Sequence, residues 1–128
     1  MDLPTQAHLA TLRDLLNYRL RELRADVHAA EVARQEASVV STHEVTDRKD
    51  EALQEQLTGV DDAQAQRDRD EMADVEAALG RLDAGTYGDC VDCGEPIALP
   101  RLLVLPAARR CAACQSAQEH AATRSGVA

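Results

Sequence analysis

Aromatic residues are nearly absent from this chain of 128 residues, which has two tyrosines, no phenylalanine and no tryptophan. A compact core of large rings is therefore excluded, and so is a base-stacking surface for single-stranded nucleic acid, which needs several aromatic side chains. Long apolar runs are lacking too, and none approaches the roughly 20 residues that span a bilayer. The N-terminal residues, with Asp2 and Pro4 and no apolar stretch, do not resemble a signal peptide. We expect a small cytoplasmic protein without a membrane partner.

Positive charge is also scarce, because 14 Lys and Arg stand against 23 Asp and Glu, for a net charge of −9. Residues 41–84 hold five basic and thirteen acidic residues and contribute −8 of this total. Residues 1–40 contribute −1, and residues 85–128 contribute zero. Proteins that bind a polyphosphate backbone gain much of their affinity from Lys and Arg. The composition therefore disfavours DNA binding as the main role.

What the chain does have is alanine, leucine and charge in helical patterns. Residues 5–40 are predicted to form one amphipathic helix, since apolar residues recur there at steps of three and four without an internal Pro or Gly. The expected buried stripe consists of Leu12, Leu16, Leu20, Leu23, Val27 and Ala30. Hydroxyl and β-branched residues cluster at 38–46 and compete with helix formation.

A second helix is predicted from about Asp47 or Asp50 to Leu82. Its expected apolar stripe consists of Leu53, Leu57, Val60, Met72, Val75, Leu79 and Leu82. Within residues 61–71 only Ala63 and Ala65 are available to pack. Gly59 also costs about 1 kcal/mol relative to alanine in a helix interior. The continuity of this helix through residues 59–71 is therefore an open question.

Two long amphipathic helices joined by a short polar turn predict an antiparallel helical hairpin, or coiled coil, over residues 1–84. The tip of the hairpin would lie near residues 41–52, where acidic side chains are frequent. A plain hairpin with no function at its tip is the simpler interpretation of this part of the chain. The fold class is thus mainly α, and residues 85–128 form a separate region.

All four cysteines fall in that region, as two CxxC pairs: Cys90 with Cys93, and Cys111 with Cys114. Two such pairs at this separation are typical of a zinc site, because each turn presents two thiolates and Zn²⁺ prefers four ligands in a tetrahedron. Disulfides and a thiol redox switch are the alternatives, but a reducing cytosol disfavours disulfides. Four sulfur ligands leave no position for water, so we expect one structural Zn²⁺ and no catalytic metal.

The residues around the cysteines carry a resemblance to a known family. The matching segments are GTYGDCVDCGEPI at 85–97, RL at 101–102, PA at 106–107 and CAACQ at 111–115. In spacing and in residue types they resemble the DksA/TraR-type zinc finger. A helical hairpin ahead of the finger is similar to the longer, DksA-like members, so the resemblance covers nearly the whole chain. It implies a C4 zinc finger followed by a C-terminal helix, expected here at about Cys111–Thr123.

The family's hairpin tip carries an Asp-x-x-Asp-x-Ala motif, which Asp47, Asp50 and Ala52 match in this sequence. Two acids in the first turn of a helix are also stabilised by the helix dipole and need no further role. The resemblance implies instead that they act at the tip. It implies a non-enzymatic bacterial regulator that binds RNA polymerase in its secondary channel. The tip would act near the active centre to modulate initiation, without reading specific DNA bases.

The sequence departs from the family at positions that hold the alarmone ppGpp. Family members that use this effector place basic residues in the second helix, before the finger proline and after the last cysteine. Counted from the cysteines, these positions are Asp74, Leu105 and Gln115, and none is basic. Phosphate recognition depends on Arg or Lys. We therefore expect a weak response to ppGpp, or none, at that shared site.

Two other functions remain as alternatives. A Gre-like factor would use tip carboxylates to hold Mg²⁺ and promote transcript cleavage by polymerase, although a four-cysteine finger is not typical of such factors. A zinc-finger DNA-binding protein would need more positive charge than the small patch of Arg101, Arg109 and Arg110. A cleavage assay and a DNA-binding assay separate these from the polymerase regulator.

Overall fold

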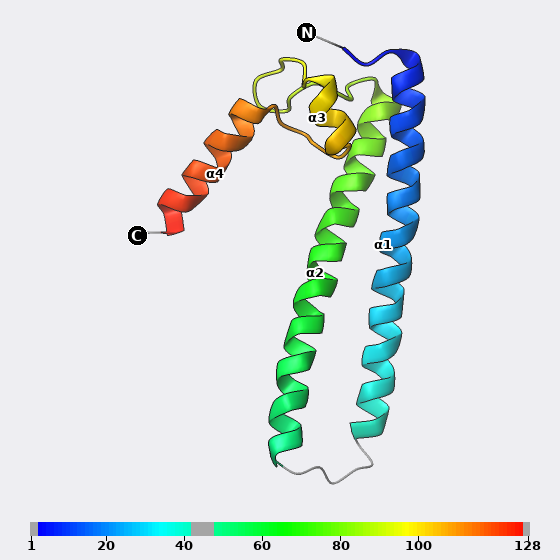
Figure 1. The fold of residues 1–128 in the computed structure, drawn as a ribbon, viewed down its shortest axis with the longest axis vertical. Coiled ribbons are helices and arrows are strands. Elements are labelled where there is room, and N and C mark those ends of the chain that lie inside the picture. The colour runs from blue at the N-terminus through cyan, green and yellow to red at the C-terminus, as the bar shows by residue number, and fades with distance from the viewer. Residues whose placement is uncertain (1–2, 42–47, 127–128) are drawn as a thin grey trace. The chain divides into compact units, whose positions relative to one another are not determined.

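The computed structural model describes residues 3–41 and 48–126, with side chains described for residues 3–38 and 59–123. Within this part of the chain the element order is α1 (Gln6–Ser41), α2 (Arg48–Ala84), α3 (Leu99–Val104) and α4 (Ala112–Gly126) (Figure 1). An isolated antiparallel bridge joins Asp89 and Pro96. The prediction of a mainly α fold is confirmed. Among the described residues, no helix combines the length and the apolar character needed to cross a membrane.

The chain divides into two compact units, to both of which α1 and α2 contribute. We call the unit of Met1–Tyr18 and Asp74–Ala128 the finger unit, since it contains all four cysteines, and the unit of Arg19–Ala73 the helix-pair unit. The finger unit also contains α3 and α4, and the helix-pair unit consists of the middle parts of α1 and α2. The predicted division of the chain at residue 84 remains a prediction.

α1 begins one residue after its predicted start, and a local hydrogen-bond exchange defines that start. The backbone N–H of His8 donates to Thr5 Oγ1 at 3.2 Å, and the N–H of Thr5 donates to His8 Nδ1 at 3.0 Å. This is the reciprocal pattern of a capping box, with histidine in place of the usual Glu or Gln. The predicted stripe is buried from Leu12 to Val27, while Ala30 is half-buried.

α2 continues without a break through residues 59–71, which answers the open question about its continuity. Ala65, Val75 and Ala78 are its buried side chains among those described. The assignment of Val60 to the apolar stripe was wrong, because its side chain is 61 % exposed. Val60 precedes Ala65 by five residues, which places it about 140° away around the helix, at 100° per residue.

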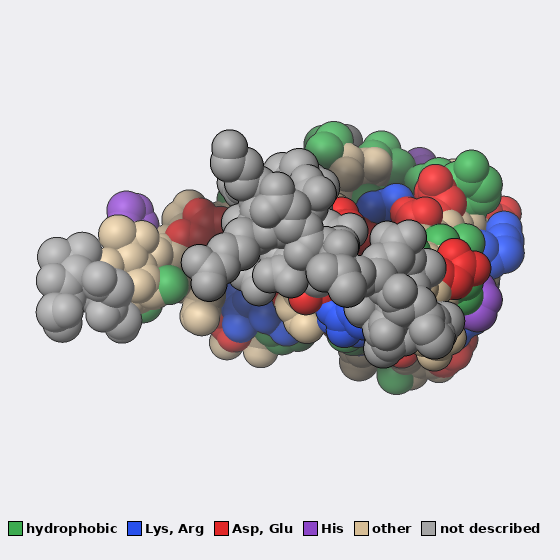
Figure 2. All heavy atoms as spheres, turned by 90° about the horizontal axis from the view of Figure 1, so that it is seen from below, with side chains coloured by type: hydrophobic (Ala, Val, Ile, Leu, Met, Phe, Trp, Pro, Cys, Tyr) green, Lys and Arg blue, Asp and Glu red, His purple; other side chains and the backbone are tan. Residues whose placement is uncertain are grey.

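Ion pairs between arginines of α1 and acids of α2 show that the two helices are antiparallel. In the finger unit, Arg13 Nη1 lies 2.9 Å from Asp83 Oδ1. In the helix-pair unit, Arg19 pairs with Glu71 and Arg34 with Asp62, so the partner number falls as the α1 number rises. Acidic and basic side chains lie next to one another on the face shown in Figure 2. The two pairs of the helix-pair unit therefore show oppositely directed helix segments there, as the sequence predicted.

The core of the finger unit joins the finger to the ends of the two long helices. The side chains buried there are Leu12, Leu16, Val75, Ala78, Tyr87, Cys90, Ile97, Leu99 and Leu102. Two of them lie on α3, a short helix that the sequence did not predict. Pro100 in its first turn suits a helix start because proline has no N–H to satisfy. Leu99 and Leu102, three residues apart on α3, therefore lie on one face and contribute to this core.

Candidate functional site

The backbone turns sharply at the end of α2, immediately before the first cysteine pair. Gly85 has a φ of 78°, in the left-handed region that glycine tolerates best. The N–H of Thr86 donates to the carbonyl of Arg81 at 2.9 Å, and the N–H of Gly85 donates to Leu82 at 3.4 Å. These two bonds form a Schellman motif, which ends the helix and satisfies its last carbonyls. Gly85 is the first residue of the segment 85–97 that resembles the DksA/TraR-type finger, and its positive φ explains why glycine suits this position.

A loop of backbone hydrogen bonds then shapes the first cysteine pair. The N–H of Cys90 donates to the carbonyl of Glu95 at 2.8 Å, and the N–H of Gly94 donates back to Cys90 at 2.9 Å. The N–H of Ile97 donates to Gly88 at 2.7 Å and fixes the base of the loop. Gly88 and Gly94 have φ values of 89° and 76°. Both glycines are therefore needed for the turn that brings the thiols of Cys90 and Cys93 together.

The second pair reaches the same place from the start of α4, with Cys114 in its first turn. The four Sγ atoms all lie within 4.8 Å of one another, and those of Cys93 and Cys111 are 3.9 Å apart. A tetrahedral Zn²⁺ with sulfur at about 2.3 Å places its ligands about 3.8 Å from one another. The Cys90 side chain is buried, those of Cys111 and Cys114 are half-buried, and that of Cys93 is exposed. The four cysteines form no disulfide.

The electrostatics of the four thiols also fit a divalent cation. The backbone N–H groups of Cys93 and Cys111 lower the pKa of the Cys90 thiol to about 6. The neighbouring sulfur atoms of Cys111, Cys90 and Cys93 raise the pKa of Cys114 to about 12. The sulfurs are thus crowded, although Cys114 lies in the first turn of α4. A divalent cation among them would relieve this crowding, because it binds all four sulfurs as thiolates.

These cysteines would hold one Zn²⁺ with four sulfur ligands, which leaves no open position for water. The ion would supply cross-linking of two turns and no reaction chemistry. The zinc is therefore structural, as predicted. Together, the fold and this centre define a helix-pair protein with a C4 zinc finger.

Several contacts that brace this centre were missed by sequence reasoning. Arg110 Nε donates to Asp92 Oδ2 at 2.6 Å, and Arg101 Nε donates to the carbonyl of Arg110 at 3.1 Å. Two of the three arginines seen as a small basic patch thus stabilise the loops around the cysteines. The Tyr87 hydroxyl donates to the carbonyl of Pro106 at 2.8 Å. Only the position of these residues close to or between the CxxC pairs could have suggested such roles.

The other predicted site residues are those of the tip and those at the candidate ppGpp positions. Asp47 is outside the described residues, and Asp50 and Ala52 belong to α2 but their side chains are not described. Their role at the tip therefore remains a prediction. The three candidate ppGpp positions lie in the finger unit, where Asp74 and Leu105 are exposed and the half-buried Gln115 donates from Nε2 to Glu119 at 3.1 Å.

Comparisons with known proteins agree with this architecture. The family model described as prokaryotic dksA/traR C4-type zinc finger matches residues 85–120. The RNA polymerase-binding transcription factor DksA of Haemophilus influenzae is 36% identical over 91 residues, which are 66% of this chain and 63% of that protein. An uncharacterised protein of Aquifex aeolicus is 44% identical over 43 residues, 34% of this chain and 30% of that protein. The chain thus matches less than two thirds of the length of these curated relatives.

A solved structure extends the likeness to nearly the whole fold. The structure of transcription factor DksA2 from Pseudomonas aeruginosa superposes with a TM-score of 0.72 at 29% identity. The match covers 92% of this chain and 88% of that one. The family resemblance is therefore confirmed: the chain contains a DksA/TraR C4-type zinc finger and is similar to DksA proteins over most of its length.

Proposed function

We propose that this chain is a non-enzymatic bacterial transcription regulator that acts in the cytoplasm by binding RNA polymerase. The observation that carries the proposal is the likeness to DksA in both the finger and the helix pair. That relative is named for polymerase binding, and its matched segment spans 66% of this chain. The acidity of residues 41–84 agrees with this role, since an acidic helix pair would be attracted to a positively charged channel.

We place the helix pair in the secondary channel of the polymerase, with Asp47, Asp50 and Ala52 toward the active centre. Asp47 and Asp50 are three residues apart, so helical geometry from residue 47 onward would put both carboxylates on one face. Alanine at position 52 would keep that end narrow. In this arrangement the tip would alter the kinetics of initiation complexes, and no residue would read DNA bases.

The substitution Asp50→Asn tests the tip directly. It removes one negative charge and keeps the shape of the side chain, so polymerase binding should persist while the effect on a sensitive promoter is lost. The matched control is Asp61→Asn, the same substitution at an exposed position of α2. Binding is measured by co-purification with core polymerase, and the effect by transcription in vitro. An Asp50→Asn protein with an undiminished promoter effect would overturn the tip assignment.

The same reconstituted system separates the alternatives. Cleavage of backtracked transcripts by polymerase, dependent on the tip carboxylates, would indicate a Gre-like factor instead. Salt-sensitive DNA affinity without polymerase would indicate a DNA-binding protein. Crosslinking from position 50 to the polymerase active site would support the proposed placement in the channel, and crosslinks confined to the outer surface would contradict it.

We also propose that ppGpp has little or no effect through the site that related proteins share with polymerase. Asp74, Leu105 and Gln115 supply no positive charge, and phosphate groups are bound mainly by Arg and Lys. Transcription with increasing ppGpp should therefore show no added effect of the protein. A variant with Lys, Arg and Lys at these three positions is the matched gain-of-function test. Strong potentiation of the unaltered protein by ppGpp would contradict the proposal.

A further inference from the structure

The seam of the helix-pair unit is thin on the α2 side. α1 supplies the buried side chains of Leu20, Leu23 and Val27, whereas Ala65 is the buried side chain that α2 supplies among those described in this unit. A methyl group makes few contacts and fits several positions along an apolar stripe. Among the described residues of this unit, fully buried apolar packing therefore specifies the axial position of α1 against α2 only weakly.

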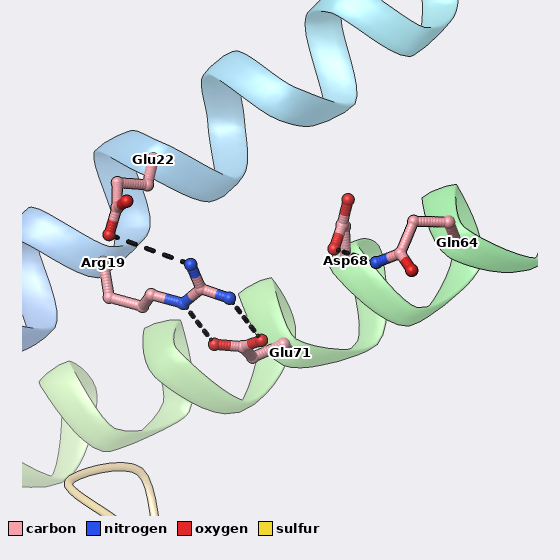
Figure 3. Close-up of polar contacts among 5 residues, drawn as sticks. All are labelled: Arg19, Glu22, Gln64, Asp68 and Glu71. Carbon is pink, nitrogen blue, oxygen red and sulfur yellow. Dashed lines mark hydrogen bonds and ion pairs between the residues drawn. The ribbon is translucent and has the colours of Figure 1, made fainter. Parts of the chain in front are cut away.

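A bidentate ion pair lies in the same unit. Arg19 donates from Nε to Glu71 Oε2 at 2.5 Å and from Nη2 to Glu71 Oε1 at 2.8 Å. Its remaining nitrogen, Nη1, lies 3.7 Å from Glu22 Oε1 on α1 itself. Figure 3 shows the guanidinium with its fork facing the carboxylate of α2. Because the guanidinium and the carboxylate are both planar, the two parallel hydrogen bonds form only at one axial position of the two helices and one orientation of the side chains.

A second pair in this unit, Arg34 with Asp62, makes the register more selective. If α2 slipped by four residues, Arg34 would face Thr58 or Gln66, and neither is acidic. In the same slip Arg19 would face Arg67 or Val75. Both ion pairs would be lost, and in one direction two arginines would oppose each other.

A slip by three residues is the more serious competitor. Arg19 would still meet a carboxylate, since Asp68 and Asp74 flank Glu71 at that spacing. Arg34, however, would face Gly59 or Ala65 and lose its partner. An aspartate is also one methylene shorter than the glutamate that now reaches the fork. Of the registers that differ by three or four residues, and so keep about the same face of α2 toward α1, only the observed one gives both arginines an acidic partner.

We propose that Arg19 and Glu71 are positioning residues, which fix the axial register of α1 against α2 and thereby place the tip residues 47–52. The proposal rests on the function proposed above. A slip of one helical turn displaces one helix along the other by about 5.4 Å. Such a displacement would take a tip carboxylate out of hydrogen-bond reach of its target, although the tip itself would be unaltered.

The test is a charge-swap cycle with Arg19→Glu, Glu71→Arg and the double variant in the zinc-loaded full chain. Arg19→Lys is the conservative variant, because it keeps the charge and removes the fork. Arg21→Glu is the matched control, since Arg21 is exposed on the same helix and forms no ion pair with another described residue. Spin-labelled noncanonical residues at the exposed positions Ala33 and Ala63 report the register without modifying the cysteines.

Each single variant should broaden the label distance distribution or shift it by about 5 Å. Each should also reduce the promoter effect, by up to about a hundredfold, as expected when a functional group is misplaced by 1 Å or more. The double variant should restore both readouts, Arg19→Lys should restore them only in part, and Arg21→Glu should change neither.

The proposal is overturned if the single variants keep the distance distribution of the unaltered chain, or if they shift it and keep the full promoter effect. It is also overturned if the swap restores stability but not the register. Failure of the proposed function has a different signature: the unaltered chain would neither bind polymerase nor affect a promoter, whereas the label distances would still show whether Arg19 and Glu71 set the register.

Discussion

The finger unit and the helix-pair unit bury their apolar side chains in different ways. In the finger unit, buried residues come from α1, α2, α3 and the loops between them, so the core has contributions from several directions. In the helix-pair unit, the described buried side chains come from two helices alone. A pair of helices has one seam and no third layer, so most of its surface stays in water. Zinc and apolar packing therefore stabilise the finger unit, whereas a narrow apolar seam with cross-helix ion pairs stabilises the helix-pair unit.

The largest expected effect is that of removing the zinc. Structural Zn²⁺ contributes about 10–16 kcal/mol in small zinc-finger peptides at pH 7, so Cys93→Ser or chelation should unfold the segment from Cys90 to Cys114. Hydrogen exchange followed by mass spectrometry should show lost protection there, while residues 20–38 stay protected. Ala113→Ser, an exposed change between two ligands, is the control. Equal loss of protection in both units would show that the zinc holds the whole chain.

The next effect compares two leucines that are both 0% exposed, Leu102 in the finger unit and Leu23 in the helix-pair unit. Leu→Ala in a buried site costs about 2–5 kcal/mol, depending on how far the surroundings can collapse. We expect Leu102→Ala near the upper end, because several elements enclose it. Leu23→Ala should lie near the lower end, because the two helices can close on the gap. Urea denaturation of the zinc-loaded variants measures both, and the reverse order would contradict this view of the two cores.

Much of the fold was predictable because it depends on periodic burial and on turn chemistry. The spacing of Leu12, Leu16, Leu20, Leu23 and Val27 predicted the buried face of α1, and all five are buried. α3 was not predictable in the same way, because a helix of six residues has too few turns for a period. Its burial follows from the tertiary core of the finger unit. The place of Val60 was misjudged because it was assigned from its spacing to Leu53 and Leu57, whereas it lies about 140° around the helix from the buried Ala65.

The metal site was predictable for a different reason, namely that ligand spacing in the sequence is itself the signal. The cross-helix pairs were not, because Arg19 and Glu71 are 52 residues apart and nothing in either helix alone indicates its partner. The same limit applies to Arg110 and Asp92. Such contacts depend on the register between elements, which the periodicity of a single element does not specify. The roles of Asp47, Asp50 and Ala52 remain predictions.

A smaller effect is expected at Tyr87, whose hydroxyl is bonded inside the finger unit. Tyr87→Phe removes this hydrogen bond and leaves the Pro106 carbonyl without it, which should cost about 1 kcal/mol. Burial raises the pKa of Tyr87 to about 12, with Arg81 opposing the shift. The contribution of the Tyr87 hydroxyl to the free energy of unfolding should therefore be complete below pH 10, which is the pKa of tyrosine in the unfolded chain. It should decrease as the pH rises toward 12, the pKa in the folded protein. Absorbance titration at 295 nm measures this, and Tyr18→Phe is the control at an exposed tyrosine.

The smallest effect is expected from Glu71→Gln in the helix-pair unit. The hydrogen bond from Arg19 lowers the pKa of Glu71 below its usual value of 4.5, so the carboxylate stabilises the folded state. Because the Glu71 side chain is 43 % exposed, solvent screening limits this to about 0.5–1 kcal/mol. Urea denaturation at several pH values and salt concentrations measures it, with Glu31→Gln, an exposed acid of α1, as the control.

The pH dependence of that difference identifies its cause. A group with a lowered folded pKa contributes fully above its unfolded value and loses its contribution as the pH falls. The stability difference between the unaltered chain and Glu71→Gln should thus be constant above about pH 5 and shrink once the pH falls below 4.5. It should also shrink in 1 M salt, where charges are screened beyond about 3 Å. A difference that ignores both pH and salt would mean that Glu71 acts through packing, and the helix-pair unit would then resemble the finger unit in how it is held.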